Sequence, residues 1–197
     1  MRSRIAVLVF FGGPAALVAF AVSLRTAGVV DSHATIEERV LEFRGEAASA
    51  AATEGVDLPL LLAVACVESS GRPDAVSRAG AVGLLQLLPP TAEEMAAEAG
   101  EGEPDLMNPA TSFRLGARYL RRQLDAFSDR AAAKELALCA YNAGPGAVAS
   151  WIRQDPPDPE ATTLGSWIPE SYGETRAFVR RVTDWEARWR ARLAEER

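Results

Sequence analysis

The chain has 197 residues, of which 48% are hydrophobic and 24% are charged, a composition that fits one globular domain with a hydrophobic core. Its formal net charge of -6 argues against a nucleic-acid partner, because such partners bind basic surfaces. His33 is the only histidine and Lys134 the only lysine, so Ser-His-Asp catalysis and histidine-bound zinc are excluded from the folded part, and acid–base chemistry must come from carboxylates.

Residues 1–30 have the pattern of a membrane-directed N-terminus. Arg2 and Arg4 precede an uncharged stretch over residues 5–24, which is about the length that crosses a bilayer. Basic residues before this stretch and acidic residues soon after it predict a cytoplasmic N-terminus and an exported remainder. We predict a transmembrane signal anchor over residues 1–30, with a cleaved signal peptide as the alternative.

The segment 31–56 is predicted to hold a short linker and a leading helix. Thr35 and Glu38 form a capping box, so one helix is expected from there to about Ala52, with Gly55 ending it. Apolar residues recur at helical spacing along the segment, which gives the helix one buried stripe.

A second helix is predicted over residues 58–67, where the sequence is apolar on every side and suits a fully buried position. Asp57 is the expected N-cap, and Gly71 ends the helix. Cys66 in this helix and Cys139 further along both lie in apolar runs, so two buried thiols are favoured over a disulfide. CxxC spacing is absent, and no metal site is expected.

The rest of the chain is predicted to be helices joined by loops, so the fold class is mainly α. The glycine-rich segment 71–90 is expected to be irregular, with a short β-hairpin. Further helices are expected from a Thr91–Glu94 capping box to about Ala99, from Asn108 and Pro109 to about Phe127, and over residues 131–141, 147–153 and 174–194.

Glu68 is the residue with the clearest chemical meaning. It lies in the last turn of the apolar helix, where burial and the negative end of the helix dipole both disfavour an ionised carboxylate. Both effects raise its pKa, and a carboxyl that keeps its proton near neutral pH can act as a general acid. A glutamate that reaches solvent from the helix end is the alternative.

Polar and aromatic residues follow Glu68 at positions suited to a ligand site. The glycine-rich loop supplies Ser77 and Gln86, whose side chains can bond hydroxyl and acetamido groups. Tyr141 and Asn142 precede a Gly-Pro-Gly break, where an aromatic ring can face a sugar. Turn-stabilising roles for Ser77 and Gln86, and a half-buried core position for Tyr141, are the alternatives.

Four blocks of sequence carry a family resemblance: ESSGRPDAVSRAGAVGLLQLLPPTA (68–92), NPATSFRLGARYL (108–120), ALCAYNAGPGAV (137–148) and IPESYGETRAFVRRV (168–182). In this order they resemble the soluble lytic transglycosylase (SLT) family of peptidoglycan-cleaving enzymes. The resemblance implies a lysozyme-like α+β, mainly helical catalytic domain over 57–197 with a glycan-binding cleft. It implies Glu68 as the single catalytic acid, no cofactor and no metal, and substrate-binding roles for Ser77, Gln86, Tyr141, Asn142 and Glu174.

The implied reaction cleaves peptidoglycan between N-acetylmuramic acid and N-acetylglucosamine and leaves a 1,6-anhydro end. Most glycosidases need two carboxylates, so a hydrolase would need a partner for Glu68. Of the near candidates, Glu94 is expected to cap a helix and Glu93 to face solvent, while Asp74 occupies a variable position of the family pattern. A mechanism with one carboxylate is therefore favoured. A muramidase that hydrolyses with water and a non-catalytic, membrane-tethered glycan-binding module are the alternatives.

The resemblance and the N-terminal pattern together imply a location in the bacterial cell envelope. The expected arrangement is an anchor in the inner membrane with the catalytic domain in the periplasm, or export after signal cleavage. The expected partners are peptidoglycan glycan strands, the membrane through the N-terminal helix, and cell-wall or secretion machinery.

Overall fold

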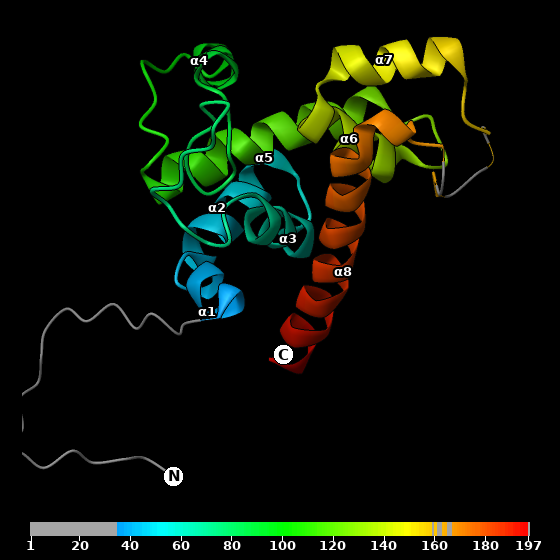
Figure 1. The fold of residues 1–197 in the computed structure, drawn as a ribbon. Helices are drawn as coiled ribbons and strands as arrows, with labels where there is room; N and C mark the ends of the chain where they lie inside the picture. The colour runs from blue at the N-terminus through cyan, green and yellow to red at the C-terminus, as the bar shows by residue number, and fades with distance from the viewer. Residues whose placement is uncertain (1–34, 159, 161–162, 165–166, 197) are drawn as a thin grey trace, which may run out of the picture. The chain divides into compact units, whose positions relative to one another are not determined.

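The computed structural model describes residues 35–158, 160, 163–164 and 167–196, which belong to the second of the two units into which the chain divides, His33–Arg197. The predicted anchor over residues 1–30 lies outside the described residues, among which no helix is both long and apolar enough to cross a membrane. The elements labelled in Figure 1 are α1 (Ile36–Leu41), α2 (Arg44–Glu54), α3 (Leu58–Glu68), α4 (Pro89–Glu98), α5 (Pro109–Ala126), α6 (Ala133–Ala143), α7 (Pro145–Gln154) and α8 (Gly173–Glu195), and a 3-10 turn, η1 (Glu170–Tyr172), precedes α8.

Helix α3 forms the centre of the core. Every residue from Leu60 to Cys66 is buried, as its uniformly apolar sequence predicts. Burying one leucine side chain stabilises a fold by roughly 1.5–3 kcal/mol, so this helix has a strong preference for the interior. Helices α1, α2 and α8 pack around it, and Figure 1 shows α8 alongside α3. Glu68, at the carboxyl-terminal end of α3, is therefore carried by a rigid core element.

Helix α8 is fastened to the core by polar as well as apolar contacts. The indole Nε1 of the buried Trp189 donates to the Cys66 sulfur at 3.4 Å. The carboxylate of Glu186, whose side chain is only 4% exposed, accepts from Lys134 on α6 at 2.8 Å and from Arg190 at 2.7 Å. Two cations thus neutralise a charge that would otherwise be costly to bury. These contacts fix the position of α8 along α3 and α6.

The leading helix differs from the prediction. The capping box of Thr35 and Glu38 is confirmed, but the single expected helix is divided at Phe43 into α1 and α2. On either side of the division, α1 places Val40 against the turn that follows α3, and α2 buries the alanines Ala47, Ala50 and Ala51.

Two other local predictions are wrong. Helix α4 begins at Pro89 rather than at a Thr91–Glu94 capping box, because proline is favoured in the first helical turn. Glu94 instead pairs with Arg122 of α5 at 2.8 Å. The expected hairpin is reduced to isolated bridges, Val76 to Val82 and Val82 to Leu87, so the described residues form no strand, and the α+β component of the prediction is absent from them.

The remaining helix and cysteine predictions hold. Asn108 caps α5 through a bond from the Thr111 amide at 3.1 Å, with Pro109 following it as expected. Asp57 occupies the N-cap of α3, although its carboxylate pairs with Arg190 rather than capping the helix. Cys66 and Cys139 are free and buried, as predicted.

Candidate active site

Helix α3 ends at Glu68, and the chain then makes a tight turn against α1. Ser70 has a positive φ of 56°, and its carbonyl accepts a hydrogen bond from Nε of Arg39 at 2.8 Å. Gly71 has a φ of +75°, and a Cβ there would lie 2.9 Å from Cβ of Arg39, so only glycine fits without displacement. Helix α1 therefore fixes the turn that positions Glu68.

The Glu68 carboxyl is partly buried and lies in an unfavourable place for a negative charge. Its pKa is raised from 4.5 to about 8, first by burial and then by the charge of Glu174, while the charge of Arg181 opposes both effects. No hydrogen bond from a described residue offsets the loss of hydration at this carboxyl. Glu68 therefore keeps its proton at neutral pH, which is the state that a general acid needs.

The loop between α3 and α4 is anchored at Leu85 by two helices. The Leu85 amide donates to Oγ of Ser112 on α5 at 3.2 Å, and its carbonyl accepts from the Tyr141 hydroxyl on α6 at 2.7 Å. A Cβ on Gly116 would lie 2.5 Å from Cβ of Leu85, so glycine at this position lets α5 approach the loop. These contacts fix the backbone immediately before Gln86.

Tyr141 is buried beside the acid. Its ring lies parallel to that of Phe178, with the ring centroids 6.4 Å apart. The pKa of the phenol is raised well above 10, mainly by burial and further by the charge of Glu68, so the hydroxyl keeps its proton. The Tyr141 hydroxyl is bonded to Leu85, so Tyr141 has the core position that was expected as the alternative to a sugar-binding role. Its contact with a sugar stays a prediction.

Gln86 and Ser77 both stabilise the loop. Gln86 has a φ of +47°, which is uncommon for a residue with a side chain. Its Nε2 donates to the carbonyls of Ala75 at 3.0 Å and Gly83 at 2.9 Å, and this leaves its amide oxygen as the available acceptor. Oγ of Ser77 accepts from the Ala81 amide at 3.0 Å. Their contact with a substrate stays a prediction.

Asn142 and Glu174 complete the predicted set. Oγ1 of the buried Thr175 donates to Oδ1 of Asn142 at 2.7 Å, which joins α6 to the first turn of α8. Glu174, the neighbour of Thr175, is exposed and close enough to Glu68 for its charge to act there. The structure thus brings Glu68, Tyr141 and Glu174 together. Asn142 lies next to Tyr141, and Gln86 lies next to the anchored Leu85. Ser77 lies on an earlier part of the same loop.

The carboxylates that were considered as partners of Glu68 lie elsewhere. Asp74, Glu93 and Glu94 are all exposed, and none of them is among the charges that perturb the pKa of Glu68. Glu94 is paired with Arg122 and so has a structural role. Glu174 is therefore the described carboxylate with an electrostatic effect on Glu68, and it acts by repulsion.

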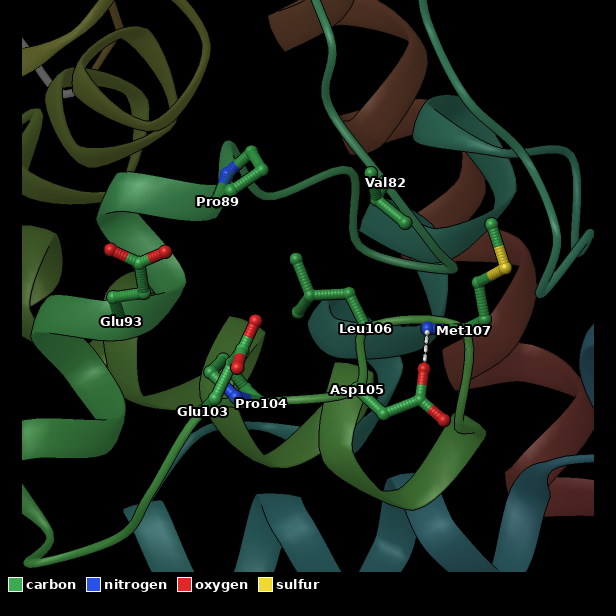
Figure 2. Close-up of a pocket in the computed structure, with 8 residues that line it drawn as sticks. All are labelled: Val82, Pro89, Glu93, Glu103, Pro104, Asp105, Leu106 and Met107. Carbon is green, nitrogen blue, oxygen red and sulfur yellow. Dashed lines mark hydrogen bonds between the residues drawn. The ribbon is translucent and has the colours of Figure 1, made fainter.

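Figure 2 shows a pocket of about 290 Å³ between the loop at Val82, helix α4 and the segment before α5. Another pocket, of about 450 Å³, lies between α2 and α5 and is lined by Ser49 and Arg114, among other residues. Neither pocket is lined by Glu68. The glycan-binding cleft at this residue thus stays a prediction.

Several positioning residues were not predicted from the sequence. Ser112, Gly116 and Thr175 each hold a part of the site in place through one contact. A glycine inside a long helix that it does not break was the available signal for Gly116, because such a glycine often marks close packing. Arg181 was also missed, although it lies seven residues after Glu174 and therefore on the same side of α8.

The protein has a mainly helical fold with a partly buried carboxyl at the end of its central helix, and its sequence matches a known domain family. The family model described as "Transglycosylase SLT domain" matches residues 46–163. The chain therefore belongs to the transglycosylase SLT domain family, as its sequence motifs predicted. The match includes Glu68, Ser77, Gln86, Tyr141 and Asn142, whereas Glu174 lies beyond it.

Named relatives agree with this assignment. The chain is 32% identical over 144 residues to the soluble lytic murein transglycosylase of Escherichia coli strain K12, an alignment that covers 70% of this chain and 22% of the relative. It is 33% identical over 122 residues to a membrane-bound lytic murein transglycosylase C of Haemophilus influenzae, covering 57% of this chain and 34% of that protein. The chain thus spans only a minor part of these relatives.

A solved structure extends the likeness to the fold. The inactive glutamate-to-glutamine variant of lytic transglycosylase Slt from Pseudomonas aeruginosa superposes with a TM-score of 0.67 at 29% sequence identity. The superposition covers 80% of this chain and 25% of the Pseudomonas chain. The mainly helical architecture is therefore shared with an SLT enzyme of known structure.

Proposed function

We propose that this chain is a peptidoglycan lytic transglycosylase, which cleaves the β-1,4 bond between N-acetylmuramic acid and N-acetylglucosamine and leaves 1,6-anhydro ends. The observation that carries the proposal is the Glu68 carboxyl, whose pKa of about 8 keeps it protonated at neutral pH. Membership of the transglycosylase SLT domain family supports the same reaction. The Pseudomonas relative, inactive when one glutamate is replaced by glutamine, supports a glutamate as the catalytic group.

In the proposed mechanism Glu68 acts first as an acid and then as a base. Its proton goes to the glycosidic oxygen, the bond from that oxygen to C1 of the muramyl sugar breaks, and the 2-acetamido group of the same sugar stabilises the cationic C1. The Glu68 carboxylate then takes the proton of the muramyl 6-hydroxyl while that oxygen bonds to C1. Glu68 ends protonated, as it began, and no water is consumed.

The environment of Glu68 suits both halves of this cycle. A carboxyl with a pKa near 8 is a weak acid, so its conjugate base is strong enough to help deprotonate a sugar hydroxyl. The proposed substrate-binding residues are Ser77, Gln86, Tyr141, Asn142 and Glu174. Among these, the amide oxygen of Gln86 and the Ser77 hydroxyl hydrogen are available for a sugar, since the bonds described above use the other polar atoms of these two side chains.

The test is to digest purified peptidoglycan with the full chain and to identify the products by mass spectrometry. The proposal expects muropeptides that are lighter by one water than hydrolysis products, and none from Glu68→Gln. Glu93→Gln is the matched control, because it removes an exposed carboxylate elsewhere and should leave the products unchanged. Hydrated ends would establish the muramidase alternative, and binding without cleavage would establish the glycan-binding module.

The location proposed for the enzyme is the cell envelope, with residues 1–30 as its inner-membrane anchor and the catalytic domain in the periplasm. The membrane-bound relative from Haemophilus influenzae supports an enzyme of this kind at a membrane. Fractionation of cells that produce the full chain tests the anchor: it should sediment with membranes, and a chain lacking residues 2–30 should not.

A further inference from the structure

One side of helix α8 begins at the candidate active site and extends away from it along the helix. Phe178 faces the site, since it is buried and its ring lies parallel to Tyr141. Glu174 stands four residues before Phe178 and Arg181 three residues after it, and residues at these spacings share one side of a helix. The electrostatic effect of both charges on Glu68 agrees with this placement. The helix therefore presents an anion and a cation on either side of Phe178.

The same side carries a cation and an aromatic ring beyond Arg181. Trp185 follows four residues later and is partly buried, and the guanidinium carbon of Arg188 lies 5.1 Å from the centroid of the Trp185 ring. Such stacking holds an arginine in place without using its hydrogen-bond donors. Arg181 and Arg188 are about 10 Å apart along the helix axis, given a rise of about 1.5 Å per residue. We call Arg181, Trp185 and Arg188 the α8 strip.

The two arginines of the α8 strip differ from others on the same helix. Arg190 and Arg192 are paired with carboxylates of Asp57, Glu186 or Glu37, whereas Arg181 and Arg188 make no ion pair within the described part of the chain. Both are exposed. Their guanidinium donors are thus open to a ligand.

Arg181 does not help the acid to keep its proton. Its charge lowers the pKa of Glu68 and so opposes the effects of burial and of Glu174. A positive charge beside a proton donor weakens the protonated state. Stabilising the protonated form of Glu68 is therefore not a role of Arg181.

We propose that the α8 strip binds the carboxylates borne by the muramyl sugars of the substrate strand, with Arg181 and Arg188 as the specificity-determining residues. The inference rests on the proposed function, because it takes peptidoglycan as the ligand. The carboxylate belongs either to the free lactyl group of a strand without peptides or to an attached peptide stem. Guanidinium groups suit both, since their paired N–H donors match the two oxygens of a carboxylate.

Binding of three ligands to the full-length chain carrying Glu68→Gln tests the proposal, because this background prevents turnover. The ligands are glycan strands with peptide stems, strands whose stems have been removed, and N-acetylglucosamine oligomers, which have no carboxylate. Arg181→Gln and Arg188→Gln are compared with Arg180→Gln, a neighbouring exposed arginine that points to another side of α8.

The expected result is that Arg181→Gln and Arg188→Gln each weaken binding of a carboxylate-bearing strand by roughly threefold to fivefold, as for an exposed ion pair. Binding of the N-acetylglucosamine oligomers should not change, and Arg180→Gln should bind all three ligands normally. Loss confined to the stem-free strands identifies the lactyl carboxylate, and loss confined to the stem-bearing strands identifies the peptide.

Equal affinities of all variants for every ligand would overturn the proposal, and so would an equal loss for the uncharged oligomers. Far-ultraviolet circular dichroism and thermal unfolding of each variant separate loss of binding from loss of folding. The outcome is distinguishable from failure of the proposed function: a wild-type chain that produced no anhydro ends would refute the reaction, while this binding experiment would still report on the α8 strip.

Discussion

Replacing Glu68 by glutamine should stabilise the folded chain by an amount that grows with pH. The pKa of this carboxyl is about 8 in the fold, against an ordinary value of 4.5. Between these two values the folded state keeps a proton that the unfolded state has released, so wild-type stability falls as the pH rises. Below pH 4.5 both states are protonated and the effect disappears, whereas above about pH 8 both are ionised and it is complete.

The magnitude follows from the two pKa values. Each tenfold difference in proton affinity corresponds to about 1.4 kcal/mol, so the advantage of Glu68→Gln should reach about 2 kcal/mol at pH 6 and at most about 5 kcal/mol above pH 8. The upper figure is a limit because Glu68 is only partly buried, and water near the carboxyl reduces the penalty for ionisation.

Urea unfolding of the full chain at several pH values from 4 to 9 measures this effect directly. The difference between Glu68→Gln and wild type in the free energy of unfolding is plotted against pH, with Glu93→Gln as the control that should give a nearly flat line. A flat line for Glu68→Gln, or a difference that shrinks as the pH rises, would refute the assignment of a raised pKa to this residue.

Three further variants probe the contacts around the acid. Glu174→Gln removes a repulsive charge, so the pKa of Glu68 should fall, and the alkaline limb of the kcat/KM profile should move to lower pH; an unchanged limb would contradict the electrostatic contact. Tyr141→Phe leaves the buried Leu85 carbonyl without its donor and should lower the free energy of unfolding by about 1–3 kcal/mol in urea titrations. Gly116→Ala places a Cβ 2.5 Å from Cβ of Leu85 and should cost about 1–3 kcal/mol in the same assay; wild-type stability of either variant would refute the anchoring of the loop.

The location of the acid could be predicted from sequence because it depends on one local pattern. A run apolar on all sides predicts a buried helix, and Glu68 is its last residue, so residues 58–68 indicate either a carboxyl buried at the helix end or one that reaches solvent from it. The structure favours the first, with α3 ending at Glu68 and burial as the largest cause of its raised pKa. The sequence blocks added the family, which the domain match confirmed.

The loop after α3 could not be derived in the same way, because distant helices determine its conformation. The Leu85 amide and carbonyl are bonded to Ser112 and Tyr141, which are 27 and 56 residues away along the chain. Such contacts satisfy the backbone without a strand ladder. This explains why the expected hairpin is reduced to isolated bridges while its backbone is still well bonded.

The value of the Glu68 pKa, as opposed to its direction, is likewise a tertiary property. Glu174 and Arg181 come from one helix, act on Glu68 with opposite sign, and stand seven residues apart, or about 10 Å along the helix axis. A small shift of α8 along α3 would bring one charge nearer to Glu68 and take the other away. The buried Glu186, bonded to Lys134 and Arg190, and the Trp189 contact to Cys66 resist such a shift. Contacts elsewhere on α8 thus contribute to the proton affinity of Glu68, because they hold α8 in register.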